Sequence, residues 1–236
     1  MTKTAILIDG AFYRKRAHYL RGEMTPERRA SELYAYCMSH IRDEGRDAAH
    51  HEDRELYRIF YYDCPPLKKT VYHPLLKRGI DFGRSSTYGW TMAFFEELKK
   101  KRKMALRLGT LSDSNAHFTL SPEKVKGICA GSISPSDLSN EDFSISFSQK
   151  GVDMRIGLDI ASLSYKKQVD QIILIAGDSD FVPAAKLARR EGIDFILDPM
   201  GATIRPDLFE HIDGLKSCWN NKKRKHYEKK LVATVE

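Results

Sequence analysis

The sequence predicts an α/β protein with a mainly parallel central sheet and helices on both of its faces. Short apolar runs rich in strand-forming residues recur along the chain, at 4–8, 56–62, 171–176 and 193–197. Stretches with helical periodicity separate these runs. Strands that alternate with helices need crossover connections, and such connections cover both faces of a parallel sheet. Ligand sites in sheets of this kind gather at the carboxyl ends of the strands.

The first two expected elements are a buried strand and a helix. Residues 4–8 (TAILI) form the strand and stop at Asp9-Gly10, a common turn dipeptide. Thr25-Pro26 suits an N-cap and a first helical residue, and apolar side chains recur at i+4 steps, which predicts a helix over 26–44. Asp9 therefore lies at the carboxyl end of a strand.

A second strand and a less regular region follow. The aromatic and β-branched run 56–62 ends at Asp63, directly before a Cys-Pro-Pro breaker. Beyond it we expect a helix near 90–103, a hairpin or two inserted strands at 104–111 and 116–120, and a flexible loop rich in Ser, Pro and Gly over 121–142.

The last third of the chain returns to a regular pattern. A strand is expected at 143–147, and Asp153 lies in the first turn of the helix that follows. Residues 171–176 form the clearest buried strand, and Gly177-Asp178-Ser179-Asp180 connects it to a helix over 181–190. A further strand, 193–197, completes the pattern.

The composition is that of an ordinary globular protein with a basic balance. Hydrophobic residues make up 42% of the 236-residue chain, enough for one sizeable core. A formal net charge of +7 favours polyanionic partners, although many basic proteins bind no nucleic acid. The first apolar run is too short for a signal peptide or a membrane span, so we expect a cytoplasmic protein without membrane contact. The four cysteines are scattered and lack zinc-site spacing.

We expect one decorated domain over residues 1–213, with an insertion around 85–142 and a basic tail over 214–236. The oligomeric state, including a homo-oligomer, is left open by the sequence.

Aspartates mark three of the predicted strand-to-helix junctions. Asp9 follows the first strand, Asp153 follows the strand at 143–147, and Asp178 and Asp180 follow the strand at 171–176. In a parallel sheet these carboxylates converge on one edge, where they repel one another and lose solvation, which favours a cation or a catalytic task. Oxygen ligands suit Mg²⁺ or Mn²⁺, which could direct hydrolysis of a phosphodiester bond. Each acid alone is better explained as a turn or cap residue, but all of them together, at equivalent ends of buried strands, favour the functional interpretation.

Other families that use a D-x-D motif fit the sequence less well. An EF-hand that began at Asp178 would need a glycine and an acid where Pro183 and Arg189 stand. A phosphatase of the haloacid dehalogenase kind would need an acid in place of Ala11. A Toprim domain normally begins with a glutamate where this chain has Asp9.

Three motifs together resemble the NYN domain, in particular its LabA-like branch. They are residues 6–10 (ILIDG), residues 150–153 (KGVD) with Asp159 six positions further on, and residues 175–181 (IAGDSDF). The resemblance implies a PIN-like Rossmannoid fold, a Mg²⁺ or Mn²⁺ site and ribonuclease activity. The positions that match the acids of the family are Asp9, Asp153, Asp178 and Asp180. Many NYN domains carry an asparagine shortly after the first motif, where this chain reads Ala-Phe-Tyr.

Several further residues are candidates for supporting roles. Asp159, Asp63 and Ser179 could act around the metal, although Asp159 could instead pair with Arg155 and the other two could be turn residues. The candidates for RNA contact, chosen because they lie beside the acidic motifs, are Arg14, Lys15, Arg16 and Lys150. The basic runs 99–103 and 222–225 are further candidates, with solvated surface as the default explanation.

The leading functional hypothesis is a metal-dependent endoribonuclease that cuts single-stranded or structured RNA. The alternative is a non-catalytic NYN protein that binds RNA or a partner protein and keeps a vestigial or regulatory metal site. A nucleotidyl or glycosyl transferase is disfavoured because the chain has no G-x-x-x-x-G-K phosphate loop.

Overall fold

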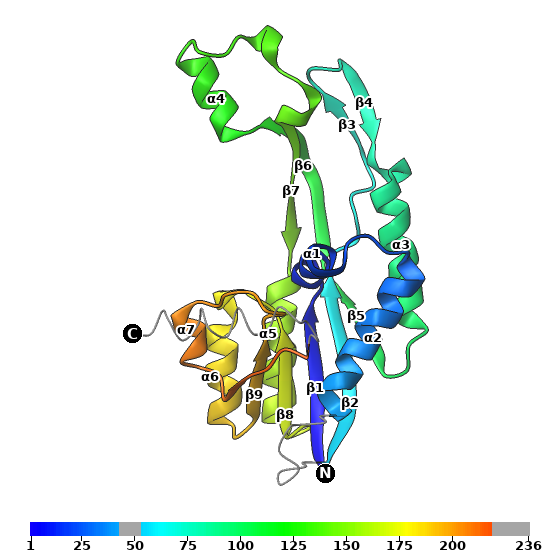
Figure 1. Ribbon diagram of the computed structural model, residues 1–236, viewed down its shortest axis with the longest axis vertical. Coiled ribbons are helices and arrows are strands. Elements are labelled where there is room, and N and C mark those ends of the chain that lie inside the picture. The colour runs from blue at the N-terminus through cyan, green and yellow to red at the C-terminus, as the bar shows by residue number, and fades with distance from the viewer. Residues whose placement is uncertain (43–52, 219–236) are drawn as a thin grey trace. The chain divides into compact units, whose positions relative to one another are not determined.

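The computed structural model describes residues 1–42 and 53–218, which fold into two compact units (Figure 1). The first unit consists of residues 1–63, 94–108 and those from 152 onward. The second consists of residues 64–93 and 109–151. It overlaps the insertion expected around 85–142, while the domain boundaries of the sequence analysis stay a prediction. Most of the predicted basic tail, including residues 222–225, lies outside the described residues.

The first unit is built on a six-stranded parallel sheet of order β10-β9-β8-β1-β2-β5. Its strands are β1 (Thr2–Asp9), β2 (Arg54–Asp63), β5 (Met104–Leu108), β8 (Gln171–Ile175), β9 (Asp194–Asp198) and β10 (Gly214–Leu215). The helices are α1 (Gly10–Arg21), α2 (Pro26–Arg42), the carboxyl-terminal part of α3 (Ser86–Lys99), α5 (Val152–Tyr165), α6 (Val182–Arg190) and α7 (Pro206–Phe209), with a short 3-10 turn η5 (Ser179–Phe181).

Helices cover both faces of this sheet because alternate strand residues point to opposite sides. Leu7 of β1 packs in one cluster with buried residues of α5 such as Ile160. On the opposite face, the ring of Tyr61 contacts those of Phe94 and Phe95 in α3, at 5.7 and 6.3 Å between centroids. Burial of such a large apolar side chain contributes roughly 1.5–3 kcal/mol. The predicted α/β class, with a parallel sheet between two helical layers, is confirmed.

The order of the strands creates a switch point between β1 and β8. From β1 the chain moves outward through β2 to β5, then returns to β8 and moves outward in the other direction through β9 to β10. Loops that follow β1 and β8 therefore diverge, and the crevice between them is the usual ligand site in open parallel sheets.

The second unit contains two antiparallel pairs. The first pair joins β6 (Thr110–Leu120) to β7 (Phe143–Lys150), and the second joins β3 (Thr70–His73) to β4 (Arg78–Asp81). A helix α4 (Pro122–Cys129) and the 3-10 turns η2 (Phe82–Arg84), η3 (Pro135–Asp137) and η4 (Asn140–Asp142) complete it.

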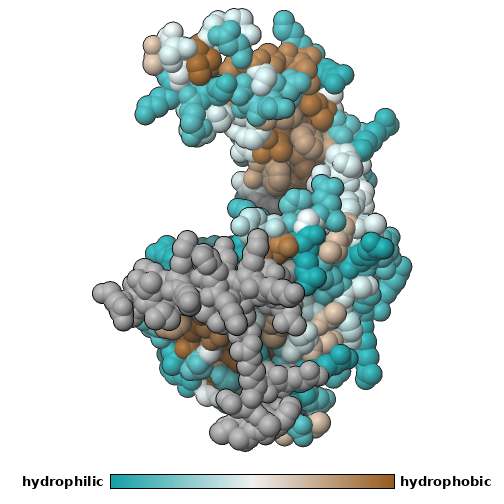
Figure 2. Space-filling model, in the orientation of Figure 1, coloured by the Kyte–Doolittle hydropathy of each residue, from teal (hydrophilic) through white to brown (hydrophobic). Residues whose placement is uncertain are grey.

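An aromatic cluster forms the core of the second unit. The His73 ring lies 4.3 Å from that of Phe118 and 5.1 Å from that of Phe143, so β3 packs on the β6–β7 ribbon. Figure 2 shows apolar surface over this ribbon, where Ile145 and Phe147 are only partly covered.

Several expectations about the middle of the chain were wrong. Residues 104–108 do not form a hairpin with 116–120; they are the edge strand β5 of the parallel sheet, and β6 pairs with β7 instead. The strand expected at 143–147 is therefore not part of the central sheet. Strand propensity is local, whereas the partner of a strand is set by tertiary packing.

Three helices were also missed, namely α1, α4 and the short α7. The expected loop at 121–142 contains α4, whose N-cap Ser121 accepts a hydrogen bond from the Lys124 amide at 3.3 Å. Helix α1 carries too many charged residues to show an apolar period in the sequence. Within the described residues, no helix is both long and apolar enough to cross a membrane.

Candidate active site

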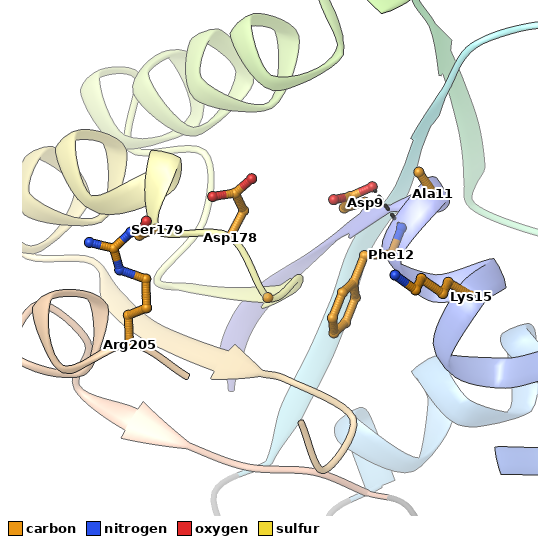
Figure 3. Close-up of a pocket in the computed structure, with 8 residues that line it drawn as sticks. Asp9, Ala11, Phe12, Lys15, Asp178, Ser179 and Arg205 are labelled. Atoms are coloured by element: carbon orange, nitrogen blue, oxygen red, sulfur yellow. Dashed lines mark hydrogen bonds between the residues drawn. The ribbon is translucent and has the colours of Figure 1, made fainter. Parts of the chain in front are cut away.

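A pocket of about 500 Å³ opens where β1 and β8 end, at the switch point of the sheet (Figure 3). All of its lining residues belong to the first unit: Asp9, Ala11, Phe12, Lys15, Gly177, Asp178, Ser179 and Arg205. The pocket therefore combines carboxylates, cationic side chains and one aromatic ring.

Asp9 is both the last residue of β1 and the N-cap of α1. One of its carboxylate oxygens accepts a hydrogen bond from the Phe12 amide at 3.1 Å, which favours the charged form. Burial acts more strongly in the opposite direction, and the negative charges of Asp153 and Asp63 add to it, so the pKa of Asp9 is raised to about 6. The charged carboxylate of Asp9 is thus costly in the absence of a cation.

Asp178 and Asp180 lie in the turn that follows β8. Asp178 is the N-cap of η5, and its carboxylate accepts a hydrogen bond from the Asp180 amide at 3.1 Å. Both side chains are exposed. In Figure 3 the carboxylates of Asp178 and Asp9 stand on opposite sides of the pocket, so a ligand between them would meet both.

Asp153 reaches this site by a different route from the expected one. It lies in the first turn of α5, after the β6–β7 ribbon, and not after a strand of the central sheet. Its pKa is raised by burial and then by the charges of Asp178 and Asp180. Since the charge of Asp153 in turn raises the pKa of Asp9, all four acids belong to one electrostatic group. Within the described residues, none of the four forms an ion pair.

The donor set fits a hydrated divalent ion better than a fully enclosed one. In the part of the chain that the structure describes, no three His, Cys, Asp or Glu side chains are grouped closely enough to hold a metal ion together. Mg²⁺ keeps several of its waters and usually takes only one or two protein carboxylates. Carboxylates that repel one another and lack an internal cation are suitable ligands for such an ion.

Asp63 and Arg14, two predicted site residues, are paired with each other. The Arg14 guanidinium lies 3.0 Å from the carboxylate of Asp63, which is 1% exposed, and the Tyr61 hydroxyl donates to the same carboxylate at 3.0 Å. Neither lines the pocket. This ion pair fixes α1 against the end of β2, so the cation of Arg14 is largely taken up inside the protein.

Asp159 also has a partner outside the pocket. It accepts hydrogen bonds from the Tyr62 hydroxyl at 2.8 Å and from Arg107 at 3.2 Å. The ion pair considered in the sequence analysis was with Arg155; the structure has Arg107 of β5 in that place. Asp159 thus connects α5 to the neighbouring strands β2 and β5.

The remaining predicted residues fall in different places. Lys15 and Ser179 line the pocket. Arg16 donates to the Met200 carbonyl at 3.0 Å and stacks over the Tyr19 ring, so it holds the segment after β9. Lys150 is the last residue of β7, in the second unit, and is exposed.

Four residues of the pocket were not predicted as site residues, namely Ala11, Phe12, Gly177 and Arg205, and two of them, Phe12 and Arg205, bring functional side chains. Phe12 occupies the region where many NYN domains have an asparagine, and its ring packs so closely on Gly177 that a Cβ there would lie 2.5 Å from it. The sequence shows the departure from the family pattern, but it does not show that the Phe12 side chain enters the pocket. Arg205 follows no recognisable motif; its exposed guanidinium pairs with Asp207 at 3.2 Å.

Comparison with known proteins supports a nuclease family. Residues 121–204 match the NYN domain, a stretch that includes Asp153, Asp178 and Asp180 but not Asp9. The match supports the NYN family, whose domains are generally nucleases of the PIN-like superfamily, and the six-stranded parallel sheet flanked by helices is consistent with that fold. No curated protein matches. A crystal structure of a protein of unknown function from Vibrio parahaemolyticus is similar, with a TM-score of 0.46 and 13% identity over 93% of this chain and 94% of that one.

Proposed function

We propose that this chain is a metal-dependent ribonuclease of the NYN family, in its LabA-like branch, that hydrolyses RNA phosphodiester bonds in the pocket between β1 and β8. The observation that carries the proposal is the group of four aspartates at the switch point of the sheet. The negative charges of neighbouring acids raise the pKa of Asp9 and of Asp153, so they make ionisation less favourable. No cation of the described residues pairs with any of the four. Such a group is stabilised by a cation from solution.

In this proposal Asp9, Asp153, Asp178 and Asp180 would hold Mg²⁺ or Mn²⁺, one or two of them directly and the others through the waters of the ion. When bound, the divalent ion supplies positive charge that polarises a phosphoryl oxygen and lowers the pKa of water. Asp9 has a pKa of about 6 without a cation, so its carboxylate is fully charged and ready to bind only above that pH. The hydrogen bond from the Phe12 amide keeps the Asp9 carboxylate oriented in either case.

The other pocket residues are suited to hold the RNA. Lys15 and Arg205 come from α1 and from the turn before α7, and both line the pocket with the acids (Figure 3). Their charges can bind the phosphates on either side of the scissile bond. The Phe12 ring offers an apolar surface for a base or ribose, and the Ser179 hydroxyl can donate to a phosphate oxygen.

The direct test is cleavage of a labelled total RNA pool by the purified chain in Mg²⁺ or Mn²⁺. Asp178→Asn should lower the cleavage rate by about 10²–10³-fold, because a carboxylate that holds the cation is lost, and with it positive charge that stabilises the transition state. Asp53→Asn is the matched control, since this exposed aspartate precedes β2 at the opposite edge of the same sheet. Mapping of the products should find 5′-phosphate ends.

Cleavage by Asp178→Asn at the normal rate with both metals would rule out this site. A second candidate function is a non-catalytic protein that binds RNA or a partner protein, which the lack of a ready three-ligand group among the described residues favours. RNA binding that persists in EDTA, with no cleavage in either metal, would establish this alternative. A homo-oligomer is a further part of the proposal, which the same preparation can address. A cytoplasmic location is another, and it needs fractionation of cells that make the protein.

A further inference from the structure

Two basic segments differ in how their charges are used. In residues 99–103, Lys99 and Lys100 pair with Glu96 and Glu97 at 2.6 and 2.5 Å. Lys101 donates to the Ser31 hydroxyl at 2.9 Å, and Lys103 lies 3.7 Å from Glu55. Although this is the most basic run of the first unit, much of its charge is neutralised by neighbouring acids.

The other segment is the hairpin arm, defined as residues 68–84, which contains β3 and β4 of the second unit (Figure 1). It has five Lys or Arg residues against a single acid, Asp81. Asp81 is already paired with Arg84 at 3.3 Å. Within the described residues, the exposed side chains of Lys68, Lys77 and Arg78 form no hydrogen bond or ion pair. Their charges are therefore available to a polyanion.

An aromatic ring lies among these cations. Tyr72 is 62% exposed, whereas its neighbours Val71 and His73 point to the other side and are buried. The ring contacts of His73 with the β6–β7 ribbon hold that inner side in place. The residue opposite Tyr72 is Gly79, so no side chain there covers the ring. A Cβ at this glycine would lie 2.7 Å from the Thr70 methyl group, so a larger residue there would need the Thr70 side chain to move.

We propose that the hairpin arm binds single-stranded RNA. Lys68, Lys77 and Arg78 would contact phosphates, and Tyr72 would stack on an unpaired base. An acidic protein would match the charge but would gain little from an open aromatic ring, whereas a nucleic acid uses both. The choice of RNA rests on the proposed function; the binding itself needs neither the aspartates nor a metal.

The test measures binding of a fluorescein-labelled U-rich 20-nucleotide RNA by anisotropy in EDTA, with the full chain carrying Asp178→Asn. The pair Lys77→Gln and Arg78→Gln should raise Kd by about 5- to 10-fold at low salt and reduce the slope of log K against log salt by about 1.4, since each single-strand phosphate contact contributes about 0.7. Tyr72→Ala should raise Kd by about 5-fold or more through lost stacking, and Tyr72→Phe should restore most of the affinity.

The matched control is the pair Lys99→Gln and Lys100→Gln, which removes the same charge from the neutralised run and should change Kd less than about 2-fold. Thermal unfolding checks that every variant is folded. The proposal is wrong if the two double variants lose the same affinity, if Tyr72→Ala binds as the parent does, or if duplex DNA or anionic vesicles bind better than the RNA. If the parent cleaves RNA with metal but the arm variants bind RNA as well as the parent does, the proposal for the hairpin arm is wrong and the proposed function stands. If binding depends on the arm but no RNA is cleaved, the proposed nuclease function is wrong and the proposal for the arm stands.

Discussion

Two kinds of aspartate stand at the carboxyl ends of the parallel strands. Asp63 at the end of β2 and Asp198 at the end of β9 are buried, and each meets a basic side chain of the protein, Arg14 and His40 respectively. Asp9 and Asp178, at the two central strands between them, line the pocket and have no such partner among the described residues. The chain thus neutralises the outer acids itself, and under the proposed function the inner ones are left to a cation from solution.

Asp198 shows how completely an outer acid is satisfied. It accepts hydrogen bonds from the Tyr36 hydroxyl, from His40 at 2.8 Å, from the Met200 amide at 2.7 Å and from the Ser217 hydroxyl at 2.6 Å. Burial lowers the pKa of His40, but its hydrogen bonds and the charge of Asp198 outweigh this effect and raise the pKa to about 9. His40 is therefore protonated at neutral pH.

Among the substitutions that test this difference between the two kinds of aspartate, the largest effect on stability is expected at Asp198. Asp198→Asn should lower the free energy of unfolding by about 3–5 kcal/mol, because it leaves the buried His40 cation without its counter-charge. The matched control is Asp180→Asn, which changes an exposed member of the four aspartates of the candidate site and should not lower the free energy of unfolding. Urea unfolding measures both. Equal losses would mean that the two kinds of aspartate do not differ.

The pH dependence of stability should reveal the same pair. The folded pKa of His40, about 9, lies above its ordinary value of 6.5. The contribution of protonated His40 to the free energy of unfolding is therefore fully present below pH 6.5 and is lost as the pH rises through about 9. The shift corresponds to roughly 3 kcal/mol. Urea midpoints between pH 6 and 10 should fall accordingly. In His40→Gln this part of the decline should be absent; an unchanged decline would assign it to other groups.

The smallest effect is expected at Asp9 and has the opposite sign. Its folded pKa, about 6, lies above the ordinary 3.8, so its charge costs stability above pH 6 and nothing below pH 3.8. Asp9→Asn should therefore stabilise the metal-free protein by about 1–2 kcal/mol at pH 8, after allowance for solvent screening, and hardly at pH 4. Added Mn²⁺ should stabilise the parent more than the variant. Destabilisation by Asp9→Asn at pH 8 would show that this acid is structural.

The sequence predicted the elements whose apolar period is strong, namely β1, α2, β2, α5, β8, α6 and β9. It also predicted that Asp9 and Asp178 follow buried strands. It could not separate Asp63 from these two, since its neutralising partner Arg14 comes from a helix without an apolar period and becomes a neighbour only in the fold. The entry of Arg205 and Phe12 into the pocket likewise depends on loop geometry.

The position of β1 in the sheet bears on the order in which the protein is made. β1 is synthesised first, but it becomes one wall of the pocket only when β8 pairs with it, after most of the chain has left the ribosome. Until then Asp9 does not lie beside Asp153, Asp178 or Asp180. If the chain is the nuclease proposed above, the aspartate group is incomplete until β8 has been made and has paired with β1, so the messenger that encodes it would be spared while it is being translated.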